Sequence, residues 1–203
     1  MKRKEEWLIT EDDLNDGVYA ISFVDQPAIE DDFQYFNAIK SNFETLNDEK
    51  KIVIGPMMIP NMDIPRRDPE TGEIFDMFFS EDTVKMIAHK YLKQKKQSEV
   101  TVDHKFAVDG ITLVESWIVE DTEKDKSAIY KKQPKGTWMG IFKINNDEIW
   151  QNYIKSGVVK GFSVEGRFIR PEIFNKYEEE KKRKLYELDA EIIEKFKELL
   201  KNI

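Results

Sequence analysis

The sequence predicts an α+β protein in which a strand-rich domain spans residues 1–171 and a helical tail spans residues 172–203. Three observations lead to this class. Apolar residues make up 40% of the 203 residues, which is enough to form the core of one domain. Short apolar runs rich in β-branched and aromatic residues are separated by turn residues, as is typical of strands. Other segments repeat apolar residues at helical spacing.

The first part of the chain is expected to be mostly strands. Its predicted strands are residues 17–24, 51–60 and 73–79. Residues 30–50 are mixed and polar, and they favour either a helix or a loop. Residues 66–72 carry Pro69, which stiffens the chain, and Gly72, which permits positive φ. These residues therefore predict a β-hairpin turn.

A helix is predicted to begin after Ser80, which is a good N-cap residue. Glu81 and Asp82 then lie in the first turn, where the helix dipole favours acidic side chains. Its apolar face is predicted to consist of Val84, Ile87, Ala88, Tyr91 and Leu92.

After residue 100 the pattern changes back to strands. The predicted strands are residues 100–106, 111–119, 128–130, 137–144 and 158–169. Residues 146–156 predict a short helix that stops at Gly157, and Pro171 is expected to close the last strand.

The tail is predicted to form an amphipathic helix whose other faces are filled with Glu and Lys. Its apolar stripe consists of Leu185, Leu188, Ile192, Phe196, Leu199 and Ile203. An isolated helix of this kind is only marginally stable in water. We expect it either to pack lightly on the domain or to dock to a partner.

Composition excludes several classes of function. The net charge of −8 disfavours binding to bare nucleic acid. The absence of cysteine excludes disulfides, thiol nucleophiles and cysteine-type zinc sites. Residues 1–13 are charged and lack the apolar run of a signal peptide. No apolar stretch approaches the ~20 residues of a membrane span. We therefore expect a soluble, intracellular protein that binds neither nucleic acid nor membranes.

The chain has two histidines, and they have different settings. His89 follows Ala88 in the predicted helix and is expected to be half-exposed. His104 falls in the predicted strand 100–106, on the same face as Val102 and Phe106. His104 is either a core histidine with one satisfied hydrogen bond or a catalytic base.

One predicted strand carries a serine bracketed by two glycines, Gly161 and Gly166. Alternation places Ser163, Glu165 and Arg167 on one face, which needs polar partners or solvent. Two interpretations explain this pattern. The segment is either an edge strand whose polar face is exposed to solvent or a strand that carries a catalytic serine. The spacing differs from the Gly-x-Ser-x-Gly elbow of the α/β-hydrolases because the second glycine comes one residue late.

A serine nucleophile needs a base, and the base needs an orienting group. Glu115 lies on the strand after His104, and a hairpin between the two strands would bring it beside the imidazole. Glu165 is the alternative, since it shares the strand and face of Ser163. Asp103 points to the opposite face from His104 and is the weaker candidate.

Six parts of the sequence occur in a characteristic order: residues 17–29, 54–60 with the 71–73 turn, 79–80, 102–104, 114–121 and 161–166. Taken together, they resemble the phage prohead (capsid-maturation) serine protease family, over roughly residues 15–170. The resemblance implies that His104 and Ser163 are the catalytic pair. It also implies a small β-barrel surrounded by helices, as in the related herpesvirus maturation proteases. Those enzymes place a second histidine after the serine, whereas both histidines here precede Ser163. The third member is then an acid or absent.

The resemblance further implies a serine endopeptidase that cleaves scaffold and major capsid protein segments, and often itself, inside the immature phage head in the host cytoplasm. Self-association is a further expectation. His104 would accept the proton of Ser163, and its ring nitrogen should lie within about 3–4 Å of that hydroxyl. Backbone N–H groups near Gly161 or Gly166 would hold the oxyanion, with Arg167 as a weaker donor. No metal or organic cofactor is required.

Two other functions fit the sequence. One is a non-catalytic head-assembly or scaffold protein that keeps the protease fold, because fold does not secure function. The other is an unrelated structural protein whose tail oligomerises as a coiled coil.

Overall fold

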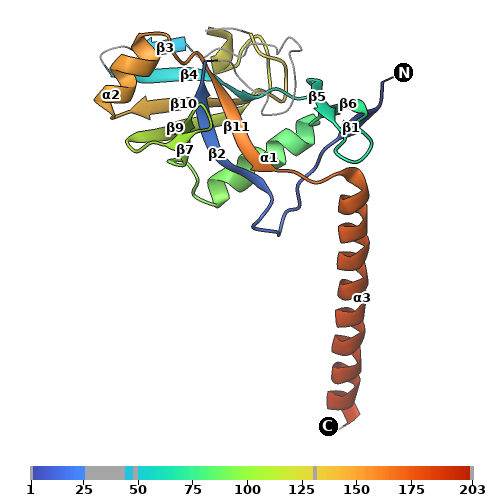
Figure 1. Cartoon of the computed structure of the whole chain (residues 1–203). Coiled ribbons are helices and arrows are strands. Elements are labelled where there is room, and N and C mark those ends of the chain that lie inside the picture. Colours follow the sequence, from blue (N-terminus) through green and yellow to red (C-terminus); the bar gives the residue numbers. More distant parts are fainter. Residues whose placement is uncertain (1, 26–43, 48–49, 130–131, 202–203) are drawn as a thin grey trace.

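The computed structural model describes residues 2–25, 44–47, 50–129 and 132–201 (Figure 1). Its elements are β1 (Lys4–Glu6), β2 (Gly17–Val24), β3 (Glu44–Asn47), β4 (Ile52–Met58), β5 (Ile64–Arg67), β6 (Ile74–Phe78), α1 (Glu81–Lys93), β7 (Val100–Val102), β8 (Phe106–Ala107), β9 (Ile111–Ile118), the 3-10 turn η1 (Lys126–Ile129), β10 (Trp138–Ile144), α2 (Asp147–Ile149), the π-helical turns η2 (Trp150–Lys155), β11 (Gly161–Arg167) and α3 (Pro171–Lys201). The predicted α+β class, with a C-terminal helix, is confirmed.

The strands form three sheets, with strand orders β1-β6-β5, β3-β4-β10-β9 and β11-β2-β7-β8. Closing a barrel requires the edge strands of a sheet to hydrogen bond to each other. In the described part of the chain the edge strand β11 passes close to β4, an inner strand of the other four-stranded sheet, but no ladder joins the two sheets. The expected closed β-barrel is therefore not formed by the described strands.

The core lies between the two four-stranded sheets. Phe23 of β2 and Phe162 of β11 meet Phe142 of β10, with ring centroids 5.3 and 4.8 Å apart. Helix α1 adds Tyr91, whose ring lies 5.4 Å from that of Trp138. Burial of these large rings contributes apolar area that stabilises the domain.

Several local predictions are confirmed. Helix α1 begins at Glu81 because the Ser80 hydroxyl accepts the N–H of Thr83 at 3.2 Å. Strands β5 and β6 form the predicted hairpin, and Gly72 in its turn has a φ of 71°. The predicted helix of residues 146–156 appears as α2 and η2, and Gly157 follows it with a φ of 73°.

Other local predictions are wrong. Residues 126–129 form the 3-10 turn η1 where a strand was expected, and Tyr130 lies outside the described residues. Most of the segment 30–50 also lies outside them, and its described residues 44–47 form β3. Residues 4–6 form β1, which the charged sequence did not suggest, because β6 offers them a parallel partner.

Pro171 begins α3 rather than simply closing the last strand, since proline fits the first turn of a helix. Strand β11 has already ended at Arg167. Helix α3 then projects away from the sheets (Figure 1). Ile203, the last residue of the predicted stripe, lies outside the described residues. Among the helices of the described ranges, none combines the length and the apolar character needed to cross a bilayer.

Candidate active site

A row of three hydroxyl side chains crosses the sheet β11-β2-β7. Ser163 of β11 lies opposite Ser22 of β2, and Ser22 lies opposite Thr101 of β7. Directly opposite residues share one face of a sheet. Ser163 and Ser22 are only 3% and 0% exposed. Phe162, the neighbour of Ser163, lies on the other face and packs in the core. The predicted alternation along β11 is thus confirmed at the serine.

His104 lies in a turn and not in a strand as predicted. Strands β7 and β8 are joined by residues 103–105, and the Lys105 N–H donates to the carbonyl of Val102 at 3.0 Å. Asp103 and His104 have φ values of 49° and 55°. This left-handed region costs a non-glycine residue about 1–3 kcal/mol, although Asp and His are among the types that enter it most often. Period-two alternation therefore could not locate the imidazole.

Strand β2 holds this turn in place. The backbone N–H of His104 donates to the Ser22 hydroxyl at 2.9 Å, and the N–H of Asp103 donates to the carbonyl of Phe23 at 2.9 Å. Each of these bonds to a buried partner offsets part of the backbone strain. The histidine is therefore positioned through its backbone, which is bonded to the middle hydroxyl of the row.

The imidazole contacts the carboxylate of Glu165. Nδ1 of His104 lies 3.0 Å from Oε1 of Glu165, and the two side chains are 14% and 13% exposed. The Thr101 hydroxyl donates to the same carboxylate oxygen. Ser163 and Glu165 come from one face of β11, as the sequence predicted. The structure therefore brings Ser163, His104 and Glu165 to one face of one sheet.

Glu115, the first choice for the orienting acid, lies elsewhere. Its strand β9 belongs to the other four-stranded sheet and pairs with β10. Its half-exposed carboxylate forms an ion pair with Lys126. The expected hairpin between the strands of His104 and Glu115 does not form, because β7 pairs with β2 and β8 instead. Asp103 also faces away, and its carboxylate accepts the N–H of Asp25 at 3.4 Å.

The tautomer of His104 follows from its carboxylate partner. A carboxylate accepts hydrogen bonds, so Nδ1 carries the proton and Nε2 is the basic nitrogen of the ring. Among the described residues no hydrogen bond joins the imidazole to the Ser163 hydroxyl. The expected separation of about 3–4 Å between these groups stays a prediction, and such contacts commonly tighten when substrate binds.

The residues expected to hold the oxyanion have different settings. Gly161 is buried and lies opposite Val24 in the ladder. Gly166 lies at a register shift, where a Cβ would come within 2.8 Å of the Gly17 carbonyl oxygen. Close backbone approach therefore explains this glycine by itself. Arg167 is exposed at the end of β11.

Ser22 and Thr101 were not selected from the sequence, although both are polar residues in apolar strands. Ser22 interrupts the buried run of β2, and Thr101 lies between two buried valines. A lone hydroxyl in such a run needs a hydrogen-bond partner, which is a usable signal. His89, by contrast, is exposed on α1. In the described ranges no group of three or more carboxylates and histidines is arranged to hold a metal ion.

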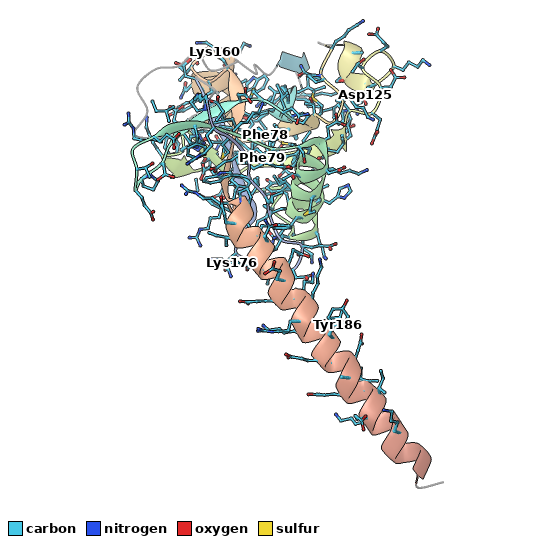
Figure 2. All side chains as sticks on the ribbon, turned by 90° about the vertical axis from the view of Figure 1, so that its right-hand side faces the viewer. Phe78, Phe79, Asp125, Lys160, Lys176 and Tyr186 are labelled. Carbon is cyan, nitrogen blue, oxygen red and sulfur yellow. The ribbon has the colours of Figure 1, made fainter. Side chains whose placement is uncertain are left out.

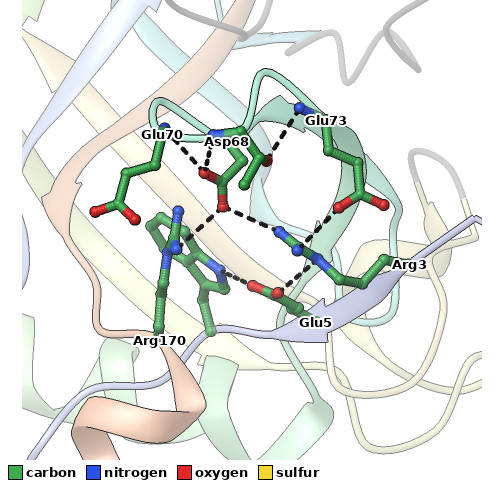
Figure 3. Close-up of polar contacts among 8 residues, drawn as sticks. Arg3, Glu5, Asp68, Glu70, Glu73 and Arg170 are labelled. Atoms are coloured by element: carbon green, nitrogen blue, oxygen red, sulfur yellow. Dashed lines mark hydrogen bonds and ion pairs between the residues drawn. The ribbon is translucent and has the colours of Figure 1, made fainter.

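A second polar cluster lies around Asp68 in the β5–β6 turn (Figure 3). Its carboxylate accepts the N–H groups of Thr71 and Glu70 at 3.1 and 3.0 Å. It also pairs with Arg3 and Arg170, each at 3.2 Å. The backbone N–H groups of Thr71 and Glu70, aided by the two guanidinium groups, lower the pKa of Asp68 to about 2. This cluster ties the N-terminus, the hairpin and the start of α3 together.

A buried serine, a histidine and a carboxylate on one sheet face form the residue set of a serine hydrolase. The family model described as "Putative phage serine protease XkdF" matches residues 40–170, more than half of the chain. The chain belongs to this family of phage serine proteases. No curated protein and no solved structure gave a significant match. The matched range contains His104, Ser163 and Glu165, whereas Ser22 and α3 lie outside it.

Proposed function

We propose that this chain is a serine endopeptidase in which Ser163 is the nucleophile, His104 the general base and Glu165 the orienting acid. The observation that carries the proposal is the 3.0 Å contact between His104 Nδ1 and Glu165 Oε1, on the sheet face that also carries Ser163. Family membership among phage serine proteases supports the reaction class.

The chemistry follows from the tautomer. Nε2 of His104 accepts the proton of the Ser163 hydroxyl while Oγ attacks the carbonyl carbon of the peptide bond. The imidazolium then donates this proton to the leaving amine, which gives an acyl-enzyme and a free amine. Water, deprotonated by the same nitrogen, hydrolyses the ester. The carboxylate of Glu165 stabilises the imidazolium at each step, because it faces Nδ1 throughout.

Thr101 positions the acid and Ser22 positions the base, and neither acts on the substrate. Thr101 donates to Glu165 Oε1 and fixes the carboxylate, and Ser22 accepts the backbone N–H of His104 and fixes the turn. Both are positioning residues, since correct geometry must exist before substrate arrives. For the oxyanion we retain the backbone N–H groups near Gly161 and Gly166, with Arg167 as the weaker donor.

We further propose that the substrates are segments of the phage scaffold and major capsid protein, cut inside the immature head in the host cytoplasm. A relation of this fold to the herpesvirus maturation proteases is part of the same proposal. Membership of a phage protease family supports a phage substrate. The net charge of −8 also makes nucleic acid an unfavourable partner.

One observation favours the alternative of a non-catalytic head-assembly protein. Ser163 is 3% exposed and makes no hydrogen bond to His104 within the described residues. Burial of this degree limits the access of a peptide to Ser163. A site that opens only when substrate binds would show the same burial, so the observation also fits a latent enzyme.

The test is incubation of wild type and Ser163→Ala with the cognate scaffold and capsid proteins, followed by mass spectrometry of the products. A serine-directed covalent probe is applied to both in parallel. Ser98→Ala, at a hydroxyl that hydrogen-bonds to Thr112 near the surface, is the matched control. Cleavage and labelling should be present in wild type and control and absent in Ser163→Ala. Equal cleavage by Ser163→Ala would refute the assignment.

A further inference from the structure

Helix α3 exposes an apolar stripe along its outer half. Leu185, Leu188 and Ile192 keep 58, 52 and 55% of their surface exposed, and Ile193 on one edge is exposed as well. Figure 2 shows this part of the helix, marked by Tyr186, standing clear of the sheets. Exposure of such an apolar strip to water is unfavourable, so a strip of this kind is normally covered by a partner.

The stripe follows an eleven-residue repeat in the sequence. Phe174, Leu185 and Phe196 occupy one position of the repeat, and Tyr177, Leu188 and Leu199 occupy a second. Ile192 and Ile203 occupy a third. Eleven residues are close to three full turns, so this stripe keeps to one side of a straight helix. The 31 residues of α3 extend over about 46 Å, which provides a long straight contact surface.

We infer that α3 pairs with α3 of a second copy in an antiparallel arrangement, with the centre of the contact near residue 194. The stripe reads almost the same in both directions about this position. Leu188 then comes opposite Leu199 or Leu200, and Ile192 opposite Phe196. Such self-complementarity is what a two-fold symmetric contact requires. The inference does not depend on the catalytic assignment.

The charge distribution of the tail also supports a second copy as the partner and an antiparallel direction of pairing. Residues 172–203 contain nine acidic and eight basic residues, so two tails attract as much as they repel. Glu191 and Lys195 lie on one flank of the stripe, and antiparallel pairing brings each beside the other residue of the second copy. Nearly all of the net charge of −8 lies in the domain, and antiparallel helices keep the two domains at opposite ends of the contact.

The geometry of the chain permits this contact. In the proposed pair the end of one helix, Lys201, reaches residue 187 of the other. Sixteen residues then separate this point from Pro171, a distance of about 24 Å along the helix. The second copy therefore fits beside the outer half of α3 without meeting the sheets of the first.

The test is the molar mass of the full chain in solution, measured by light scattering over a range of concentrations. We expect a dimer for wild type, a monomer for Ile192→Glu and a dimer for Ala190→Glu, whose site faces away from the stripe. Circular dichroism confirms that each variant keeps its helix content. Glu191→Lys and Lys195→Glu should each weaken the dimer several-fold, and the double variant should restore it.

Orientation is tested with Leu188→Cys, because the chain has no cysteine of its own. In the antiparallel pair the two cysteines lie about 18 Å apart along the axis, too far for a disulfide. A disulfide-linked dimer under mild oxidation would overturn the antiparallel arrangement. A wild-type chain that stays monomeric at every soluble concentration would overturn the pairing itself. Binding of a scaffold protein to the stripe of such a monomer would identify the other occupant.

Discussion

The carboxylates of Asp68 and Glu165 are both largely buried, with side chains 7 and 13% exposed, but their hydrogen-bond donors differ. Asp68 receives two backbone N–H groups and two guanidinium groups. Glu165 receives one hydroxyl and one imidazole. Guanidinium groups and backbone amides keep their protons at any ordinary pH, whereas imidazole in general gains and loses one near neutrality.

This difference separates a structural cluster from the candidate active site. The donors of Asp68 lower its pKa to about 2, so the carboxylate stays negatively charged at ordinary pH and the cluster only holds chain segments together. The partner of Glu165 can change its charge, so the same kind of contact can support proton transfer. Burial and hydrogen bonding of a carboxylate therefore do not by themselves mark an active site. The chemistry of the donors is what supports the proposed role of Glu165.

The largest effect is expected from the candidate active site. Ser163→Ala and His104→Ala should each lower the rate of substrate cleavage by about four orders of magnitude or more, because the two residues act as one unit. The double variant should be little slower than either single variant. The cleavage rate is measured on capsid-associated substrate, with His89→Ala as the control. Additive losses in the double variant would contradict a shared mechanism.

The orienting acid is expected to have the next largest effect. Glu165→Gln should lower the cleavage rate by about a hundred-fold or more, because an amide no longer stabilises the imidazolium. Glu115→Gln should leave the rate unchanged, since its carboxylate pairs with Lys126 in another sheet. Comparison of the two rates decides between the acids. A larger loss in Glu115→Gln would reverse the assignment.

A smaller effect is expected at Thr101. Thr101→Val removes the hydroxyl that fixes Glu165 and should lower the cleavage rate about tenfold, and Thr101→Ser should restore it. Long-range ¹H–¹⁵N NMR of His104 provides an independent readout. The wild type should show the proton on Nδ1, and the valine variant a mixture of tautomers. An unchanged tautomer together with an unchanged rate would show that Thr101 serves only packing.

The structural cluster is expected to affect stability and not chemistry. The lowered pKa of Asp68 means that its stabilising effect is complete above the ordinary Asp pKa of about 4 and is lost as pH falls through about 2. Asp68→Asn should therefore lower the melting temperature clearly at pH 7 and progressively less as the pH approaches 2. Thermal unfolding of both proteins across this range measures the difference. A difference that grows on acidification would contradict this account.

The smallest effect on the domain is expected from loss of the tail. Removal of residues 172–203 leaves Arg170 and its pair with Asp68 in place. It removes the exposed pair of Lys181 with Asp12, and exposed pairs contribute little. The melting temperature should stay nearly unchanged, while packaging into the prohead should fall. A truncated domain that fails to fold would show that α3 belongs to the core.

The sequence by itself determined the features that depend only on residues close together along the chain. The Ser80 cap, the turn of residues 66–72 and the stripe of the tail are local patterns of residue type and spacing. The shared face of Ser163 and Glu165 also follows from alternation along one strand. These features hold whatever the rest of the molecule does.

Tertiary structure alone decided how the candidate site is assembled. The contact of His104 with Glu165 joins residues 61 positions apart, and its bond to Ser22 joins residues 82 positions apart. Both depend on which strands pair and in what register, and strand pairing rests on long-range burial that no local pattern encodes. The same pairing holds His104 at positive φ in a turn. For this reason the sequence could name both Glu115 and Glu165 as the acid, and only the sheet places one of them beside the imidazole.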